Sequence, residues 1–287
     1  MKLLLVFITT LILQGTSCQA SEFLQESTKA ASWSAFKSSF ISPDGRVRDP
    51  QQENSSHSEG QAYGMLIALM HNDPETFSQV WSWSKNNLQI RLDNLLAWRW
   101  GLHSSGYWQV LDYNNATDGD IITAWALLLA NKRWGNPTYK QDAILILEDV
   151  IKNLRLQVSL RKQNLQLLLP GYYGYLKSNK IKINPSYILP DAFMEFSLHH
   201  QNHAWLALYK SSSTLWRAAL LPDSRLPSDW LTLNLKSDKF EPAPLFGNEA
   251  IRIILYQCWQ VKHSTSLLRG IYNWLDVYKE NKELKAK

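Results

Sequence analysis

Four carboxylate side chains stand at the expected starts of helices, where they could carry out acid–base chemistry. They are Glu59, Asp118, Asp120 and Glu249. Hydrolysis of a glycosidic bond needs two opposed carboxyl groups, of which one protonates the leaving oxygen and the other activates water. The four residues are sufficient for this reaction.

Glu59 is the leading candidate for the proton donor. A position in the first turn of a helix stabilises the ionised carboxylate and lowers its pKa, which is unfavourable for an acid. If Asp118 lies close to Glu59, like-charge repulsion and desolvation would keep one of the two protonated. The alternative, that Glu59 only complements the helix dipole, stays open at this point.

Local signals predict the helices that must hold these carboxylates. Ser58 followed by Gln61 resembles a capping box and predicts a helix from Ser58 to about residue 71. Thr117 and Asp120 repeat the arrangement before an apolar helix that ends near residue 134. Two glycines at positions 60 and 64 cost about 1 kcal/mol each against alanine, which indicates close packing or binding at the backbone there.

The remaining segments predict a mostly helical chain. Further helices are expected at 21–40, 73–87, 139–156, 191–200, 205–220, 249–262 and 267–278. Strand patterns are sparse, and no long Pro- or Ser-rich linker interrupts the sequence. We therefore expect one all-α domain over residues 21–287, with a few short strands in its loops.

The composition excludes several classes of function. The chain has 287 residues and a net charge of +5 without long Lys/Arg runs, which does not favour nucleic acid binding. Neither common glycine pattern for nucleotides is present. His199 and His203 are four residues apart but lack companion ligands, so we expect no metal and no cofactor. The 13 tryptophans suit either core packing or the apolar faces of sugars.

The N-terminus has the pattern of a secretory signal peptide over residues 1–20. Lys2 precedes an apolar run that is too short to span a bilayer, and small residues favour cleavage after Ala20. Lipid attachment at Cys18 is less favoured, because Gly15 stands where a bulkier aliphatic residue is usual. The mature chain is expected in the periplasm or outside the cell, with no membrane span.

Several short motifs together resemble one family of enzymes. The motifs are SEGQAYGM at 58–65, ATDGD at 116–120 and Trp134, with GRV at 45–47, AWRWG at 97–101, NPSY at 184–187 and AIR at 250–252. In this order they closely resemble glycoside hydrolase family 8, and within it the secreted endoglucanases that accompany bacterial cellulose synthase.

The resemblance implies a fold and a reaction. The fold is an (α/α)6 barrel of six inner and six outer helices, with a cleft across the N-terminal ends of the inner helices. The reaction is inverting hydrolysis of β-1,4-glucan, by a monomer that could work beside the cellulose synthase complex.

The resemblance also implies roles for residues. Glu59 corresponds to the general acid, and Asp118 to the carboxylate that contacts the sugar at the cleavage point. Tyr187 would assist near the attacking water. The other expected substrate-binding residues are Tyr63, Trp98, Trp100, Asp120 and Arg252.

One position departs from the family pattern. The usual general base is an aspartate just before Ala-Ile-Arg, whereas Glu249 stands there in this chain. Glutamate keeps the chemistry and extends the carboxylate by one methylene. We expect Glu249 to act as the base. The alternatives are the same mechanism on xylan or chitosan, and a weakened enzyme that serves as a glucan-binding subunit.

Overall fold

The computed structural model describes residues 19–160, 163–200 and 202–259, with 269, 272, 273 and 276, and side chains from residue 28 onward. Residues 1–18 of the predicted signal peptide, including Cys18, lie outside this part. Among the described residues, no helix combines the length and apolarity needed to cross a bilayer.

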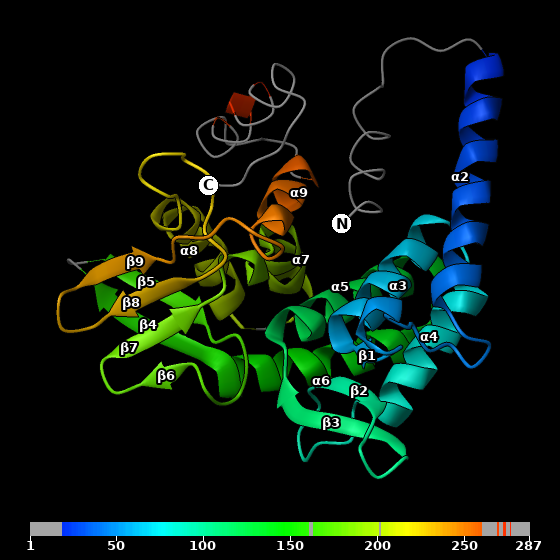
Figure 1. The fold of residues 1–287 in the computed structure, drawn as a ribbon, viewed down its shortest axis with the longest axis horizontal. Helices are drawn as coiled ribbons and strands as arrows, with labels where there is room; N and C mark the ends of the chain where they lie inside the picture. Colours follow the sequence, from blue (N-terminus) through cyan, green and yellow to red (C-terminus); the bar gives the residue numbers. More distant parts are fainter. Residues whose placement is uncertain are drawn as a thin grey trace.

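Helices dominate the described part of the chain (Figure 1). Eight are present there: α2 (Gln19–Phe40), α3 (Ser58–Met70), α4 (Pro74–Asn87), α5 (Thr117–Trp134), α6 (Pro137–Leu154), α7 (Pro190–His199), α8 (Ala204–Ala218) and α9 (Ile251–Trp259). Two short 3-10 turns, η1 (Pro50–Gln52) and η2 (Pro185–Tyr187), accompany them. The predicted helices up to α9 are found, with ends that shift by a few residues, whereas most of the helix predicted at 267–278 lies outside the described residues.

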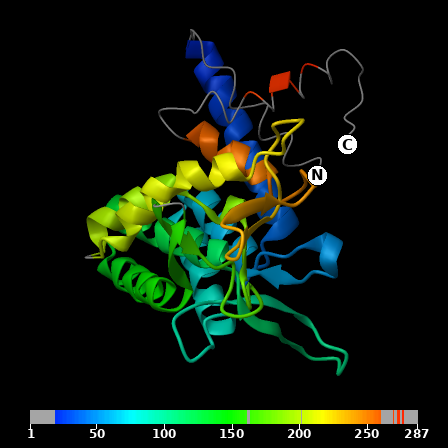
Figure 2. The same cartoon turned by 90° about the vertical axis from the view of Figure 1, so that its left-hand side faces the viewer.

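Three antiparallel sheets lie among the helices. Their strands are β1 (Ser56–His57), β2 (Ala97–Leu102) and β3 (Trp108–Asn115), then β4 (Arg155–Leu160) with β5 (Gln163–Leu168), and β6 (Leu176–Lys177), β7 (Lys180–Ile183), β8 (Leu231–Asn234) and β9 (Lys239–Pro242). Figures 1 and 2 show the β2–β3 hairpin extending from the helices on one side and the β6–β9 sheet on another. The strands are more numerous than their weak sequence patterns predicted, because most are short and only half buried.

The core is built on the packing of α3 against α5, with α4 and α6 alongside. Most of α5 is buried, including Ile121, Ile122 and Leu127, none of which is exposed. A helix that is apolar on every side belongs inside a domain. The first turns of α3 and α5, which carry Glu59 and Asp118, are thereby held side by side.

The helix starts at Ser58 and Thr117 are confirmed, but the predicted capping boxes are wrong. Neither helix has a side-chain cap. The Gln61 side chain instead accepts from Val47 N at 2.5 Å and donates to Ser84 Oγ at 2.9 Å. Thr117 Oγ1 donates to Leu169 O at 2.6 Å. Tertiary partners therefore replace the local cap bonds that the sequence pattern indicated.

Close packing explains two of the glycines near the site. A Cβ on Gly64 would lie 2.8 Å from Val47 Cγ2, and one on Gly119 would lie 2.4 Å from Ser58 Oγ and 3.1 Å from Glu59 N. A Cβ on Gly60 would meet nothing within 4 Å. The predicted close approach is therefore found at Gly64 but not at Gly60.

Gly119→Ala should separate the first turns of α3 and α5. We expect it to lower the free energy of unfolding by about 1–3 kcal/mol, as for an overpacked core, and to reduce turnover. Gly60→Ala, the control, should raise that free energy by up to about 1 kcal/mol. Chemical denaturation measures both, and equal stability of the two variants would contradict this account of the α3–α5 contact.

Candidate active site

The Arg252 side chain joins two of the predicted carboxylates. Its Nη1 lies 2.5 Å from Asp118 Oδ2, and its Nη2 contacts Glu249 Oε2. Arg252 stands in the first turn of α9, whereas Asp118 opens α5. The side chain of Asp118 is fully buried and that of Arg252 is 14% exposed. Because a buried charge needs a partner, the three residues form one electrostatic unit.

Glu59 lies beside this unit, in the first turn of α3. Its Oε2 accepts a hydrogen bond from Ser58 Oγ at 3.0 Å. Burial is the largest cause that raises the pKa of Glu59, and the charge of Glu249 raises it further, against lowering by its own backbone N–H and by Arg252. Glu59 and Glu249 therefore act on one another electrostatically. The helix start lowers the pKa of Glu59, and a proton donor needs an opposing effect that raises it. Desolvation mainly provides that effect.

Asp118 has the most clearly perturbed carboxylate of the unit. Burial raises the pKa of Asp118 to about 7, and the charges of Glu59 and Glu249 add to this although Arg252 opposes it. One oxygen of Asp118 also accepts from Gly119 N at 2.9 Å. Because Asp118 is desolvated and lies near two other carboxylates, it retains its proton to higher pH than an isolated aspartic acid would.

Glu249 is the most open of the three carboxylates, with 33% of its side chain exposed. Besides Arg252, its Oε2 accepts from Asn184 Nδ2 at 2.7 Å, and Ser186 Oγ lies 3.3 Å away. Asn184 and Ser186 come from the η2 segment and are themselves bonded to one another at 2.7 Å. One oxygen of Glu249 is thus fixed by two donors, Arg252 and Asn184, while its side chain still reaches solvent.

Three tyrosines lie around Arg252, and two of them, Tyr63 and Tyr187, were predicted to contact the substrate. The Tyr63 hydroxyl is 2.5 Å from that of Tyr256, and burial raises the pKa of Tyr63. The guanidinium carbon of Arg252 lies 5.5 Å from the centre of the Tyr187 ring. Burial, with the nearby charges of Asp118 and Glu59, raises the pKa of Tyr187, so its hydroxyl stays protonated. The structure therefore brings Tyr63 and Tyr187 to the carboxylates.

The two predicted tryptophan platforms have different surroundings. Trp98 stacks on His57, with ring centroids 5.5 Å apart. His57 immediately precedes Ser58 and Glu59 in the chain. Trp100 is stacked on Trp108 at 5.0 Å, and the Arg46 guanidinium lies 4.9 Å from the Trp100 ring centre. Both rings therefore have partners within the protein, and Trp98 is the one close to the start of α3.

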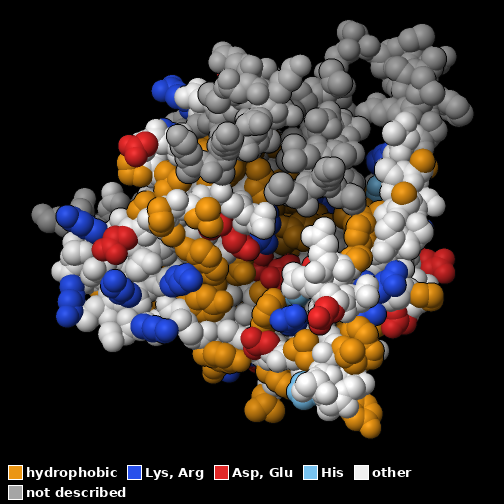
Figure 3. Space-filling model, in the orientation of Figure 1, with side chains coloured by type: hydrophobic (Ala, Val, Ile, Leu, Met, Phe, Trp, Pro, Cys, Tyr) orange, Lys and Arg blue, Asp and Glu red, His pale blue; other side chains and the backbone are white. Residues whose placement is uncertain are grey.

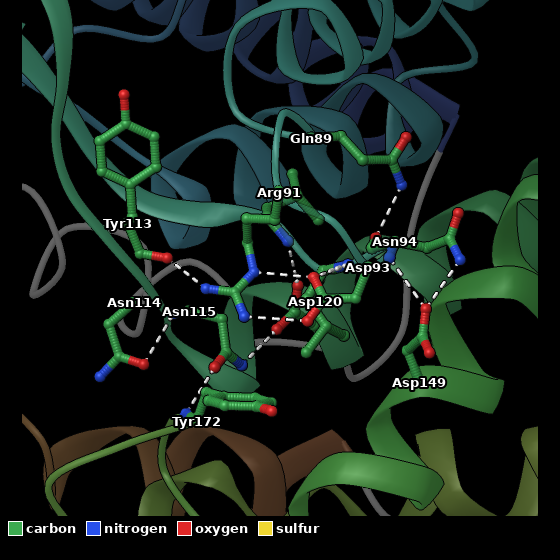
Figure 4. A network of polar contacts seen from close by, with 12 residues as sticks. Gln89, Arg91, Asp93, Asn94, Tyr113, Asn114, Asn115, Asp120, Asp149 and Tyr172 are labelled. Carbon is green, nitrogen blue, oxygen red and sulfur yellow. Dashed lines mark hydrogen bonds and ion pairs between the residues drawn. The ribbon is translucent and has the colours of Figure 1, made fainter.

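Asp120 lies in a separate polar network (Figure 4). Its Oδ1 accepts from Leu96 N at 2.8 Å, and its Oδ2 accepts from Asn115 Nδ2 at 2.7 Å. Asn115 Oδ1 in turn accepts from Tyr172 N at 2.7 Å. Burial raises the pKa of Asp120 to about 8. The network connects α5 to the β2–β3 hairpin and to the loop that begins at residue 170.

Some functional contacts were not predicted from sequence. Asn184 and Ser186 were noticed only as parts of a motif, and Tyr256 was not singled out. Figure 3 shows acidic side chains in a hollow near the middle of the face drawn, and basic ones gathered over the β6–β9 sheet. Among the described residues, no cluster of three or more His, Cys, Asp or Glu side chains could hold a metal ion.

Taken together, a partly buried acid, an exposed carboxylate and a buried aspartate tied to arginine define an acid–base hydrolase site. The family model for glycosyl hydrolases family 8 matches residues 9–285. The chain therefore belongs to this family, whose members are inverting glycoside hydrolases.

Relatives with known names agree with this assignment. An endoglucanase of Cellulomonas uda is 34% identical over 250 residues, which are 86% of this chain and 67% of that protein. A probable endoglucanase of Novacetimonas hansenii is 36% identical over 236 residues, or 80% of this chain and 67% of that one.

Solved structures support the fold. The endo-β-1,4-glucanase CMCax of Acetobacter xylinum has a TM-score of 0.79 at 33% identity, over 87% of this chain and 78% of that one. The predicted (α/α)6 barrel is confirmed, and the described residues include eight helices.

Asp118→Asn should shift the pH profile of kcat. Above about pH 7, where Asp118 ionises, the asparagine removes a negative charge that opposes ionisation of Glu59, so the pKa of Glu59 falls. Since a general acid must be protonated, the alkaline limb should move to lower pH. The control, Asp120→Asn, lies on the same helix but replaces a carboxyl that is largely neutral below about pH 8. An unchanged limb in Asp118→Asn would contradict the coupling.

Proposed function

We propose that this chain is an endo-β-1,4-glucanase that hydrolyses internal glucosidic bonds with inversion. The observation that carries the proposal is the contact of one guanidinium, that of Arg252, with both Asp118 and Glu249, beside a Glu59 of raised pKa. Membership of the family and the names of relatives at 34–36% identity support β-1,4-glucan as the substrate.

In this proposal Glu59 is the general acid. Its raised pKa keeps the carboxyl group protonated, so it can donate to the glycosidic oxygen as the bond to the anomeric carbon breaks. The Asp118 carboxylate would contact the sugar at the cleavage point, where its charge stabilises the oxocarbenium-like transition state. Arg252 keeps that carboxylate oriented.

Glu249 is the general base in the same proposal. It removes a proton from a water whose oxygen forms the new bond to the anomeric carbon on the face opposite the leaving group. Arg252 and Asn184 donate to Oε2 and orient the carboxylate, and in the described part of the chain no hydrogen bond from protein engages Oε1. The longer glutamate is therefore compatible with a working base, which favours an enzyme over a binding subunit.

The other predicted contacts follow from their surroundings. Tyr63, Trp98 and Tyr187 are proposed to contact the glucan, since they lie at or near the carboxylates. Trp100 would contribute through its outer edge, because Trp108 and Arg46 already contact its ring. Asp120 is proposed to support the site and not to bind sugar, because both of its oxygens are bonded within the protein.

The setting proposed for the enzyme is bacterial glucan export. The signal-peptide pattern supports a periplasmic or secreted enzyme, and the resemblance noted above supports a monomer that works beside a cellulose synthase complex. Xylan is the second candidate substrate. The reducing-end-xylose releasing exo-oligoxylanase that resembles this chain is only 18% identical, at a TM-score of 0.70, so it supports the fold and not the substrate.

Reducing-sugar release from carboxymethyl cellulose tests the proposal. The wild type should be active, and Glu59→Gln and Glu249→Gln should each lower kcat by about 10²–10⁴-fold, because each removes a proton-transfer group. The matched control is Glu75→Gln, which also changes a glutamate in the first turn of a helix but lies away from the site. This control should keep the wild-type rate.

Two results would contradict the proposed function. An inactive wild type that still binds cello-oligosaccharides would identify a binding subunit. An active enzyme whose first product is the β-anomer by NMR would be a retaining hydrolase, because inversion of a β-linkage releases the α-anomer. If xylan or chitosan were hydrolysed faster than the cellulose derivative, the proposed substrate would be wrong and the proposed mechanism would still stand.

A further inference from the structure

A buried aspartate outside the site described above holds the turn that carries Glu249. Asp229 precedes β8, and its Oδ1 accepts hydrogen bonds from Gly247 N and from Ala250 N, each at 2.8 Å. These two N–H groups lie on either side of Glu249 in the chain. The carboxylate of Asp229 therefore fixes the backbone both before and after the proposed base.

The two hydrogen bonds to Asp229 Oδ1 form a clamp on the turn, and the surroundings of Asp229 make this clamp rigid. Asp229 is 7% exposed, and its own N–H donates to Leu245 O at 2.9 Å. The neighbouring Ser228 Oγ donates to Ala243 O at 2.6 Å and lies 2.7 Å from Trp230 O. The segment at 228–230 is thus bonded repeatedly to the strand and loop that lead to Glu249.

Gly247 shows how closely the clamp fits. A Cβ at this position would lie 2.5 Å from Asp229 Oδ2, which is too close for any side chain without movement. Glycine therefore lets the carboxylate approach the backbone. The carboxylate plays the part of a helix cap that comes from another segment, since it accepts from N–H groups at the start of α9.

We infer that Asp229 is a positioning residue for Glu249, which fixes the position and direction of this carboxylate in the site. The inference rests on the proposed function of Glu249 as the base. Asp229 contacts neither Glu249 nor Arg252 by a side-chain bond, so it acts through the backbone of the turn. Misplacement of a catalytic group by about 1 Å can cost around a hundredfold in rate.

A mutant cycle between Asp229 and Glu249 tests this role. Asp229→Ala should lower kcat on a fluorogenic cello-oligosaccharide by about 10–100-fold, with KM changed less than about twofold. In the Glu249→Gln background the same change should cost almost nothing more, because the base that Asp229 positions is already absent. A merely structural role would instead reduce both backgrounds equally.

Further variants separate positioning from folding. Asp229→Asn keeps an acceptor oxygen and should retain most of the activity lost in Asp229→Ala. Gly247→Ala displaces the clamp while the aspartate remains, and should lower kcat at constant KM even if Asp229→Ala fails to fold. Asp142→Ala is the matched control, because Asp142 is similarly buried and bonds Trp81 and Lys85 far from the turn.

The outcomes distinguish this inference from the proposed function. If Glu249→Gln abolishes turnover while Asp229→Ala or Gly247→Ala, correctly folded, keeps the wild-type kcat, the positioning role is overturned and the base assignment stands. Additive losses in the cycle would overturn it as well. If Glu249→Gln keeps the wild-type rate, the proposed function itself fails.

Discussion

The site depends on one cation shared by two carboxylates from distant parts of the chain. Arg252 pairs with Asp118 at the start of α5 and with Glu249 at the turn before α9. A buried ion group of this kind is stable only when its geometry and hydrogen bonds are complete, and removal of one partner is strongly destabilising. The elements that carry these residues are therefore constrained to meet at one place.

The helix packing places the acid beside this ion group. α3 and α5 approach so closely at their first turns that Gly119 faces Ser58 and the backbone of Glu59. The resulting burial raises the pKa of Glu59 and of Asp118, while Glu249 keeps a third of its side chain exposed. One fold thus gives similar carboxyl groups different environments, which is how acid and base roles become distinct.

Much of this could be predicted from the sequence. The starts of α3 and α5 were predicted at the right residues, although from capping boxes that do not form, and the motifs around Glu59 and Asp118 indicate the family. The capping boxes could not be predicted correctly, because Gln61 and Thr117 bond to partners that only the tertiary fold brings near.

The supporting contacts were still less accessible to sequence reasoning. Asp120 and Asp118 stand at the same predicted helix start, yet Asp118 binds Arg252 whereas Asp120 binds Asn115 and Leu96 N. Residues two apart on a helix point in different directions, so sequence proximity does not place them in one site. Asn184 and Ser186 were indicated only as members of the NPSY motif and Asp229 not at all, because their roles depend on a turn some 20 to 65 residues away.

The turnover of Arg252→Lys tests the central claim most directly. A lysine keeps the positive charge but cannot donate in parallel to two carboxylates as the planar guanidinium does. The account predicts a folded protein by circular dichroism whose kcat on carboxymethyl cellulose is at least about tenfold lower, with KM little changed. A folded lysine variant with the wild-type kcat would contradict the claim that one guanidinium organises both carboxylates.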